Sequence, residues 1–378
     1  MVSDCLTASG DKTASLTADD RRMTLAQGFP GLAGDPVESR GGGDAGLVTA
    51  IARMTAAAGL PALRLIADIA ALAAGPGRIS IADYERLRLY DERFWERADR
   101  REVAGRARAR RLVGAANFRA DWRGLATDRI AWGAYLAAHG LPVAPMLAVY
   151  REGLAGGPGL LRTRDELRDF LTGEAGRPLV ALPADGGPPR RLWARDEADA
   201  GGAIDRLIED VADRPNLSWL VQPLLRGHPQ APCGAAGAAM PVRVLTLAGA
   251  QGAKVARAYW PLGGPREAVA SLELRTGAAN AVFAAASPER ARAPPKGLEA
   301  PDWARLKAVA VEAARAMTAF GLISWEIAPT EEGPVIVGLD PAPDLDLFQL
   351  ADRQGLLTPE LGAFLAERRR RRADRVGA

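Results

Sequence analysis

The segment from Leu322 to Asp340, LISWEIAPTEEGPVIVGLD, constrains the fold more than any other part of this chain. Two arms rich in β-forming residues flank a polar turn that ends in glycine. If residues Glu331–Gly333 form a three-residue loop with the glycine in the left-handed conformation, Thr330 faces Pro334. The segment therefore predicts a β-hairpin with a fixed register.

This register brings two carboxylates together. Glu326 lies opposite Gly338, and the alternation of side chains puts Ser324, Glu326 and Asp340 on one face. Glu326 and Asp340 are then diagonal neighbours, roughly 7–8 Å apart, so both can approach one cation. Hard oxygen ligands at this spacing suit Mg²⁺ that bridges phosphate oxygens. The alternative is a hairpin whose acids face water.

Arg243 interrupts an otherwise largely apolar strand expected at Pro241–Leu247. A guanidinium group beside two acids would complete a phosphate-binding site, because it carries a permanent charge and can donate two hydrogen bonds to one anion. The alternative is a structural salt bridge between Arg243 and one of the two acids.

The length of 378 residues predicts two or three lobes, each with its own apolar core. From residue 126 onward, helical stretches alternate with short apolar strands, which is typical of an α/β protein. The expected organisation is a disordered tail at 1–45, a helical N-terminal region at 46–125, a first α/β lobe at 126–225, a second lobe with the hairpin at 226–362, and a basic tail at 363–378.

The scarcity of some side chains excludes several chemistries. His139 and His228 are the only histidines, which nearly excludes a Ser-His-Asp triad or a histidine-ligated metal. Cys5 lies in a polar tail and Cys233 in a Gly/Ala/Pro loop, so neither a disulfide framework nor a zinc site is expected.

Charge and hydropathy limit the partners. A net charge of +3 does not favour nucleic acid, no apolar run approaches the length of a membrane span, and the first residues carry no secretion signal. We therefore expect a soluble cytoplasmic protein, and the oligomeric state stays open. Arginines at Arg97–Arg111 and Arg368–Arg372 raise the alternative of a nucleic-acid or acidic-membrane surface, which ranks last because no aromatic platform accompanies them.

Several motifs, in order, resemble the ATP-grasp superfamily, and within it the sugar-transfer-associated family related to α-L-glutamate ligases. The similarity covers roughly Ile79–Leu357 and includes ISIADYERLRLYD, NFRADWRGLATDRIAWGAYLAAHGLPVAP, LVQPLLRGHP with VRVLT, and LISWEIAPTEEGPVIVGLDPAPD. The resemblance implies an ATP-grasp fold of class α/β (α+β), with a helical N-terminal extension. It places a nucleotide site between two α+β lobes, at 126–225 and 226–362.

The resemblance also implies nucleotide-binding residues in the first lobe. Arg129 replaces a lysine that opens the helix before the nucleotide lobe, and Leu182 stands where the family carries a lysine for the α/β phosphates. Arg190 or Arg191 would substitute for that lysine. Gln222 lies in the strand that resembles the adenine-binding linker.

In the hairpin, Glu326 matches the family's aspartate, Gly338 its second acid and Asp340 its asparagine, while Arg243 matches an arginine in the preceding sheet. The implied cofactors are ATP and Mg²⁺. Glu326 and Asp340 would hold the metal, and Arg243 would act in catalysis by stabilising the γ-phosphate.

Members of this family generally activate a carboxylate as an acyl phosphate, which an amine or similar nucleophile then attacks. We therefore expect an ATP-dependent ligase that acts on a small-molecule carboxylate, by analogy in cell-surface polysaccharide or small-molecule assembly. The alternative is a pseudoenzyme that keeps the fold as a binding or scaffolding module. Leu182, Gly338 and the stiff Pro188-Pro189 pair favour that alternative.

Overall fold

Local sequence signals set the ends of several helices. The predicted capping box at Thr163 is present, and its hydroxyl accepts a hydrogen bond from the backbone of Glu166 in α9 (Arg164–Gly173). Asp128 caps α8 (Arg129–Ala138) by accepting hydrogen bonds from two backbone N–H groups of its first turn. Gly140 follows α8 with a φ of 72°, a conformation in which glycine is unstrained.

A computed structural model describes residues 44–92, 94–95, 97–117, 120–153, 159–174, 176–186, 190–193, 200–234, 237–263, 268–284 and 287–376. The expected tail at 1–45 therefore lies outside the described residues except for its last two positions. The remaining domain boundaries stay predictions.

The region before the first sheet is helical, as expected. Its elements are α2 (Asp44–Ala58), α3 (Ala62–Ala74), α4 (Ile81–Arg86), α5 (Arg97–Glu102), α6 (Arg106–Ala116), the 3-10 turn η1 (Ala120–Trp122), α7 (Arg123–Thr127) and α8. Among the described helices, none alone has the length and apolar composition to cross a membrane, although α2 and α3 would meet that test jointly despite the 109° bend between them.

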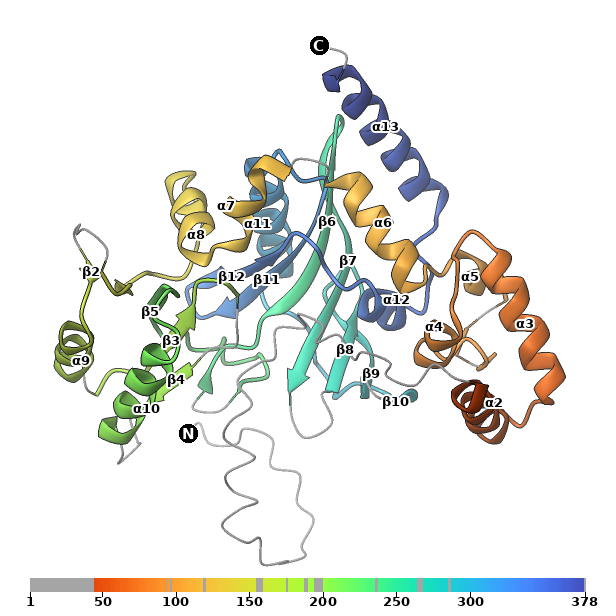
Figure 1. Cartoon of the computed structure of the whole chain (residues 1–378), viewed down its shortest axis with the longest axis horizontal. Coiled ribbons are helices and arrows are strands. Elements are labelled where there is room, and N and C mark those ends of the chain that lie inside the picture. The colour runs from red at the N-terminus through yellow and green to blue at the C-terminus, as the bar shows by residue number, and fades with distance from the viewer. Residues whose placement is uncertain are drawn as a thin grey trace, which may run out of the picture.

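The first sheet has five strands in the order β2-β1-β5-β3-β4. Their bounds are β1 (Ala148–Tyr150), β2 (Leu160–Leu161), β3 (Leu179–Pro183), β4 (Arg190–Trp193) and β5 (Trp219–Pro223). Apolar side chains of α9 and α10 (Ala200–Ala212), including Leu167 and Leu207, pack with Leu179 and Val221 of the sheet into a separate core. This sheet and its helices form the lobe at the left of Figure 1.

The second sheet has seven antiparallel strands in the order β10-β9-β8-β7-β6-β11-β12. Their bounds are β6 (Val242–Gly249), β7 (Gly252–Gly263), β8 (Ala268–Leu272), β9 (Ala279–Ala284), β10 (Ser287–Arg292), β11 (Leu322–Thr330) and β12 (Gly333–Asp340). The expected hairpin thus forms one edge of the larger sheet.

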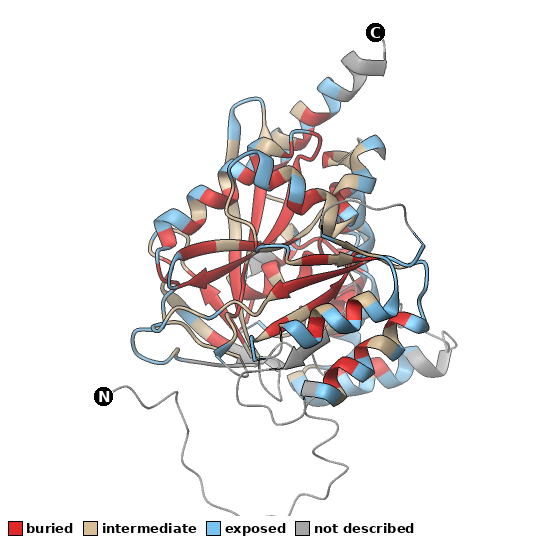
Figure 2. Ribbon diagram, turned by 90° about the vertical axis from the view of Figure 1, so that its left-hand side faces the viewer, coloured by how far each residue is buried: buried red, intermediate tan, exposed pale blue. Residues whose placement is uncertain are grey.

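Both faces of the second sheet are covered. On one face, Val244 and Trp325 pack with residues of α8 and α11 (Trp303–Ala316). On the other, Leu245 and Tyr259 share a core with the N-terminal helices and with α12 (Asp346–Asp352) and α13 (Pro359–Val376). Most of its central strand residues are therefore buried (Figure 2), and the helical region is packed directly onto the hairpin's sheet.

The basic tail expected at 363–378 is helical as far as the structure describes it, because residues 363–376 belong to α13. Arg368 is 4% exposed and donates to the carbonyl oxygens of Ala116 and Ala319. This arginine anchors α13 on the C-terminal end of α6. The structure confirms the expected α/β class with its helical N-terminal extension.

Candidate functional site

The hairpin pairs Glu326 with Gly338, as the sequence predicts, but its turn differs from the predicted one and a bulge shifts the register. Its turn has two residues, and Thr330 faces Gly333 instead of Pro334, so the expected three-residue loop is wrong. The register then shifts by one residue between Glu326 and Ile327, which restores the predicted pairing nearer the open end. A β-bulge of this kind adds one residue to a single strand, and here it cancels the error at the turn.

One row of side chains crosses four strands of the sheet at this level. Gly338, Glu326, Arg243 and Tyr259 are successive cross-strand partners on β12, β11, β6 and β7. Arg243 Nη1 lies 2.6 Å from Glu326 Oε1, and both side chains are largely buried. The salt bridge considered as an alternative role for Arg243 is therefore present.

The space beside Gly338 is filled by Glu326. A Cβ atom at position 338 would lie 2.7 Å from both Cδ and Oε2 of Glu326, closer than real Cβ contacts. The glutamate is one methylene longer than the aspartate of the motif that it resembles, and it leans over the position where that motif has a second acid. Glycine at 338 and glutamate at 326 are therefore sterically matched.

Asp340 occupies the next position on the same face. It pairs with Ser324 across the hairpin, and its Oδ1 accepts a hydrogen bond of 2.8 Å from the backbone of Ala342. Burial raises the pKa of Asp340, and the negative charges of Glu326 and Asp344 raise it further against the opposing effect of Arg243. A cation beside Asp340 would therefore relieve unfavourable interactions between acids.

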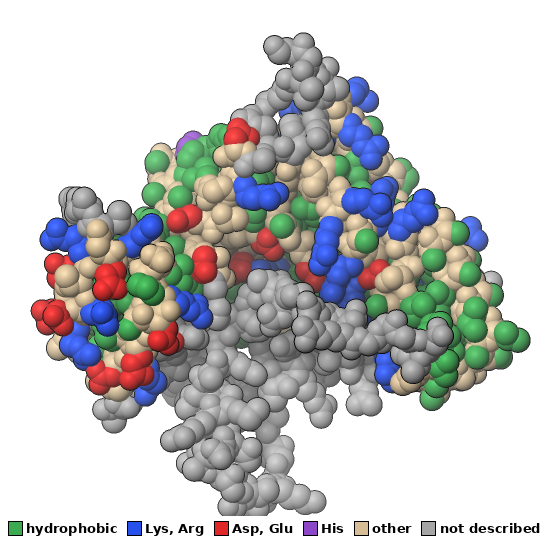
Figure 3. All heavy atoms as spheres, in the orientation of Figure 1, with side chains coloured by type: hydrophobic (Ala, Val, Ile, Leu, Met, Phe, Trp, Pro, Cys, Tyr) green, Lys and Arg blue, Asp and Glu red, His purple; other side chains and the backbone are tan. Residues whose placement is uncertain are grey.

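The protonation states of Arg243 and Tyr259 determine the charge of this row. Burial lowers the pKa of Arg243, but the electrostatic effects of Glu326, Tyr259 and Asp340 together outweigh burial, so the net shift is upward. Burial also raises the pKa of Tyr259 to about 12. Arg243 is therefore charged and Tyr259 neutral near pH 7. Figure 3 shows acidic side chains gathered at the middle of this face, between the five-stranded lobe and the rest of the molecule.

Arg129 joins the two lobes at the hairpin. Its backbone N–H donates to the carbonyl oxygen of Ala184, just after β3, and its Nη1 donates to the carbonyl oxygen of Val337 at the bulge. Burial lowers the pKa of Arg129, while the charges of Glu326 and Asp185 oppose that shift. Its Nε is buried without a hydrogen-bond partner.

Leu182 and Gln222 line the same narrow crevice as Arg129 and Val337. The side-chain nitrogen of Gln222 donates to the carbonyl oxygen of Ala144, at 3.1 Å, in the segment between α8 and β1. The structure thus brings together three of the positions that the motifs single out in the first lobe. The roles assigned to them stay predictions.

Arg190 and Arg191 lie at the start of β4, where their backbones pair with Ala181 and Val180 of β3. Their side chains lie outside the described residues, so their predicted phosphate contacts stay predictions. The Pro188-Pro189 pair also lies outside the described residues.

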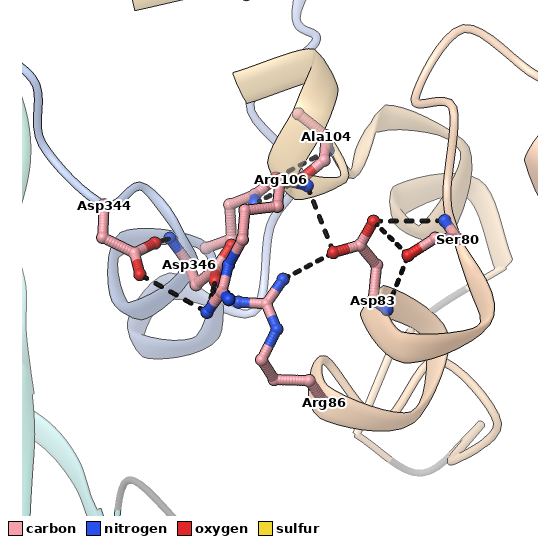
Figure 4. Close-up of polar contacts among 8 residues, drawn as sticks. Ser80, Asp83, Arg86, Ala104, Arg106, Asp344 and Asp346 are labelled. Atoms are coloured by element: carbon pink, nitrogen blue, oxygen red, sulfur yellow. Dashed lines mark hydrogen bonds and ion pairs between the residues drawn. The ribbon is translucent and has the colours of Figure 1, made fainter. Parts of the chain in front are cut away.

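A charge network beyond the hairpin was not foreseen from the sequence. Arg106 at the start of α6 lies 3.8 Å from Asp344 and 3.6 Å from Asp346, and Arg86 also forms an ion pair with Asp346 (Figure 4). Asp83 binds Arg86 at 2.6 Å and accepts a hydrogen bond from the backbone of Arg106. The only sequence signal was the presence of ISIADYER among the motifs. The network links the N-terminal helices to the segment after Asp340.

The donor set fits one hard divalent cation shared with phosphate oxygens. Within the described residues, no group of three or more His, Cys, Asp or Glu side chains could hold a metal ion by itself. Glu326 and Asp340 offer two carboxylates, and the pKa of Asp340 is raised mainly by burial, with Glu326 and Asp344 adding to the shift. Mg²⁺ commonly binds through one or two carboxylates and completes its coordination with phosphate and water.

Comparisons with known proteins give similarity only at the level of structure. No family model and no curated protein matches the chain. The D-alanine-D-alanine ligase from Coxiella burnetii is 10% identical, with a TM-score of 0.43 over 67% of this chain and 59% of its own. The ATP-grasp ligase PsnB, complexed with minimal precursor, Mg and ADP, is 18% identical, with a TM-score of 0.39 over 67% and 62%.

The D-cycloserine synthetase DcsG is 19% identical, with a TM-score of 0.41 over 65% of this chain and 71% of its own. The present chain therefore spans less than two thirds of the first two of these proteins.

Proposed function

We propose that this protein is an ATP-dependent ligase of the ATP-grasp type, which activates a carboxylate as an acyl phosphate for attack by an amine or similar nucleophile. The observation that carries the proposal is the convergence of Arg243, Glu326 and Asp340 on one face of the sheet. Arg129 reaches the same hairpin from the other lobe. Two acids and two guanidinium groups at a junction between lobes suit a magnesium–phosphate ligand.

Each residue has a role in this proposal. Glu326 and Asp340 would hold Mg²⁺, which neutralises charge on the phosphate oxygens when bound. Arg243 stabilises the γ-phosphate, and its pairing with Glu326 keeps the guanidinium beside the metal-binding face. Arg129 and Gln222, which line one narrow crevice with Leu182, contact the nucleotide at the junction between the lobes. Arg190 or Arg191 supplies the second positive charge for the α/β phosphates.

The reaction needs no protein nucleophile. A substrate carboxylate oxygen attacks the γ-phosphorus, the bond to the ADP oxygen breaks, and ADP leaves. The amine then attacks the acyl carbon, phosphate leaves, and the amine loses a proton. The protein contributes positioning and preorganised charge. The motif resemblance points to cell-surface polysaccharide or other small-molecule assembly as the setting.

A second candidate is a scaffold that has lost productive ATP binding. Three of the proposed ligand groups already have partners inside the protein: Glu326 binds Arg243, Arg129 binds the bulge carbonyl, and Gln222 binds the Ala144 carbonyl. Leu182 adds an apolar side chain to the crevice. These contacts favour the scaffold, because they use the proposed ligand groups to hold parts of the protein to one another.

Thermal denaturation with ATP and Mg²⁺ separates the two candidates. A ligand that binds only the folded state at 100 times its Kd stabilises it by about 2.7 kcal/mol, so an active protein unfolds at a higher temperature. Glu326→Ala and Asp340→Ala should remove this shift and any ATP turnover. Glu331→Ala, an exposed acid on the turn of the same hairpin, is the matched control and should keep both. Wild-type protein without a shift at saturating nucleotide would favour the scaffold.

A further inference from the structure

We propose that Asn117 is a positioning residue for Asp340, because it ties together the two chain segments at the open end of the hairpin. The inference rests on the proposed function, in which Asp340 and Glu326 share one cation. Asn117 directly follows α6, a helix of the N-terminal region. Its side chain therefore connects that region to the candidate site.

The side-chain amide of Asn117 donates two hydrogen bonds and accepts two at the base of the hairpin. Its nitrogen donates to the carbonyl oxygens of Leu322 at 2.5 Å and Pro341 at 2.7 Å. Its oxygen accepts from the backbone N–H groups of Gly321 at 2.8 Å and Leu322 at 2.9 Å. One amide thus holds both the beginning of β11 and the residue after Asp340.

This bridge stands where the hairpin ladder ends. The last paired residues of β11 and β12 are Ser324 and Asp340, and no further pair between these strands continues toward Leu322. Pro341 cannot donate a backbone hydrogen bond to extend the ladder. Asn117 supplies the missing cross-link beside Asp340, and so it limits how far Asp340 can move away from Glu326.

The position of Asn117 is itself fixed from two directions. Arg368 donates two hydrogen bonds, of 3.0 and 2.8 Å, to the carbonyl oxygen of Ala116, the residue before it. At the other end of α6, Arg106 lies near Asp344 and Asp346. The segment that leaves the hairpin is therefore held near both ends of a single helix, which lies beside α13 in Figure 1.

A purely structural role for Asn117 would be to attach the N-terminal helices to the sheet. Gln349 provides the comparison, because its fully buried amide makes two equivalent contacts, with the backbone N–H of Ala104 at 2.8 Å and its carbonyl oxygen at 3.1 Å. Gln349 joins α12 to the link between α5 and α6. Replacement of Gln349 by alanine should weaken the attachment of the N-terminal helices and leave the hydrogen bonds at the hairpin unchanged.

The test compares Asn117→Ala, Asn117→Asp and Gln349→Ala in the full-length protein. The Mg²⁺ concentration for half-maximal ATP binding is measured by calorimetry, and amide hydrogen exchange is measured by mass spectrometry without ligand. Loss of a residue that orients a metal ligand typically costs 10–100-fold in metal affinity, so we expect at least a tenfold higher Mg²⁺ requirement for Asn117→Ala. Asn117→Asp should be at least as weak, because its carboxylate faces two carbonyl oxygens.

Hydrogen exchange should rise in peptides that cover 320–324 and 339–345 for both Asn117 variants. The Mg²⁺ requirement of Gln349→Ala should stay within twofold of wild type. Equal Mg²⁺ requirements for Asn117→Ala and Gln349→Ala, or unchanged exchange at the hairpin base, would overturn the inference. A wild-type protein that binds ATP no better with Mg²⁺ than without it would instead remove the proposed function. Exchange in the unliganded variants would then still decide whether Asn117 holds the backbone at Asp340.

Discussion

Replacement of Gly338 by alanine places a methyl group against the carboxyl group of Glu326. The Cβ would lie 2.7 Å from Cδ and Oε2, whereas ordinary contact begins near 3.4 Å, so the carboxyl group must retreat by about 0.7 Å or more. The atoms in contact form the far end of a flexible side chain, so the fold can accommodate the change. The retreat moves Glu326 away from its place beside Arg243.

The expected effect is large on function and small on stability. A misplacement of about 1 Å at a catalytic centre can cost roughly 100-fold in rate, so we expect kcat/KM for the ATP-dependent reaction to fall about 10- to 100-fold. The free energy of unfolding should change by less than about 1.5 kcal/mol, because the weakened Arg243–Glu326 pair is partly offset by lower chain entropy in the unfolded state. Until a substrate is found, calorimetric binding of ATP with Mg²⁺ replaces the rate measurement.

The double variant Glu326→Asp with Gly338→Ala provides the control, because the shorter acid withdraws by one methylene and leaves room for the methyl group. It should recover part of the lost binding. Binding of ATP by Gly338→Ala at the wild-type level would refute the steric argument. So would a double variant whose loss in ATP-binding free energy exceeds the sum of the losses in the two single variants.

Three further predictions concern charge, two at the candidate site and one at the end of α12. Burial raises the pKa of Asp340, so its contribution to stability is complete below the unfolded pKa near 3.8 and is lost as pH rises through the raised folded pKa. Asp340→Asn should therefore raise the unfolding temperature at pH 7 and lose that advantage near pH 3. The same variant should abolish Mg²⁺-dependent ATP binding. Burial raises the pKa of Asp352 to about 6 despite its ion pair with Arg257, so the stability of Asp352→Asn relative to wild type should be greater at pH 8 than at pH 3 by on the order of 3 kcal/mol. A difference in unfolding free energy that does not vary with pH would contradict this sign. Leu182→Lys should tighten calorimetric ATP binding severalfold if the crevice takes phosphates, whereas the scaffold predicts no gain.

The sequence was sufficient to predict the hairpin and its central pairing. Periodicity and the Glu-Glu-Gly turn located both arms, because side-chain alternation is a local property. The turn length was wrong by one residue, since Gly333 takes a φ of 116° in a position paired with Thr330. The bulge that corrects the register depends on contacts between strands, and no local signal at Val337 indicates it.

Contacts between distant segments were beyond the sequence argument. Asn117 and Leu322 are more than two hundred positions apart, and neither carries a pattern that names the other. The steric match between Glu326 and Gly338 was also missed, because the glycine was interpreted as an absent ligand. Only the position of the Glu326 side chain shows that a larger residue at 338 would displace it.

The most direct measurement of the central claim is a crystal structure of the protein soaked with a non-hydrolysable ATP analogue and Mg²⁺. We predict nucleotide density between β3 and the β11–β12 hairpin, with a metal ion within about 2.1 Å of a carboxylate oxygen of Glu326 or Asp340 and the terminal phosphate beside Arg243. Density at another surface, or an unchanged Arg243–Glu326 pair with no nucleotide at saturating concentration, would contradict the account.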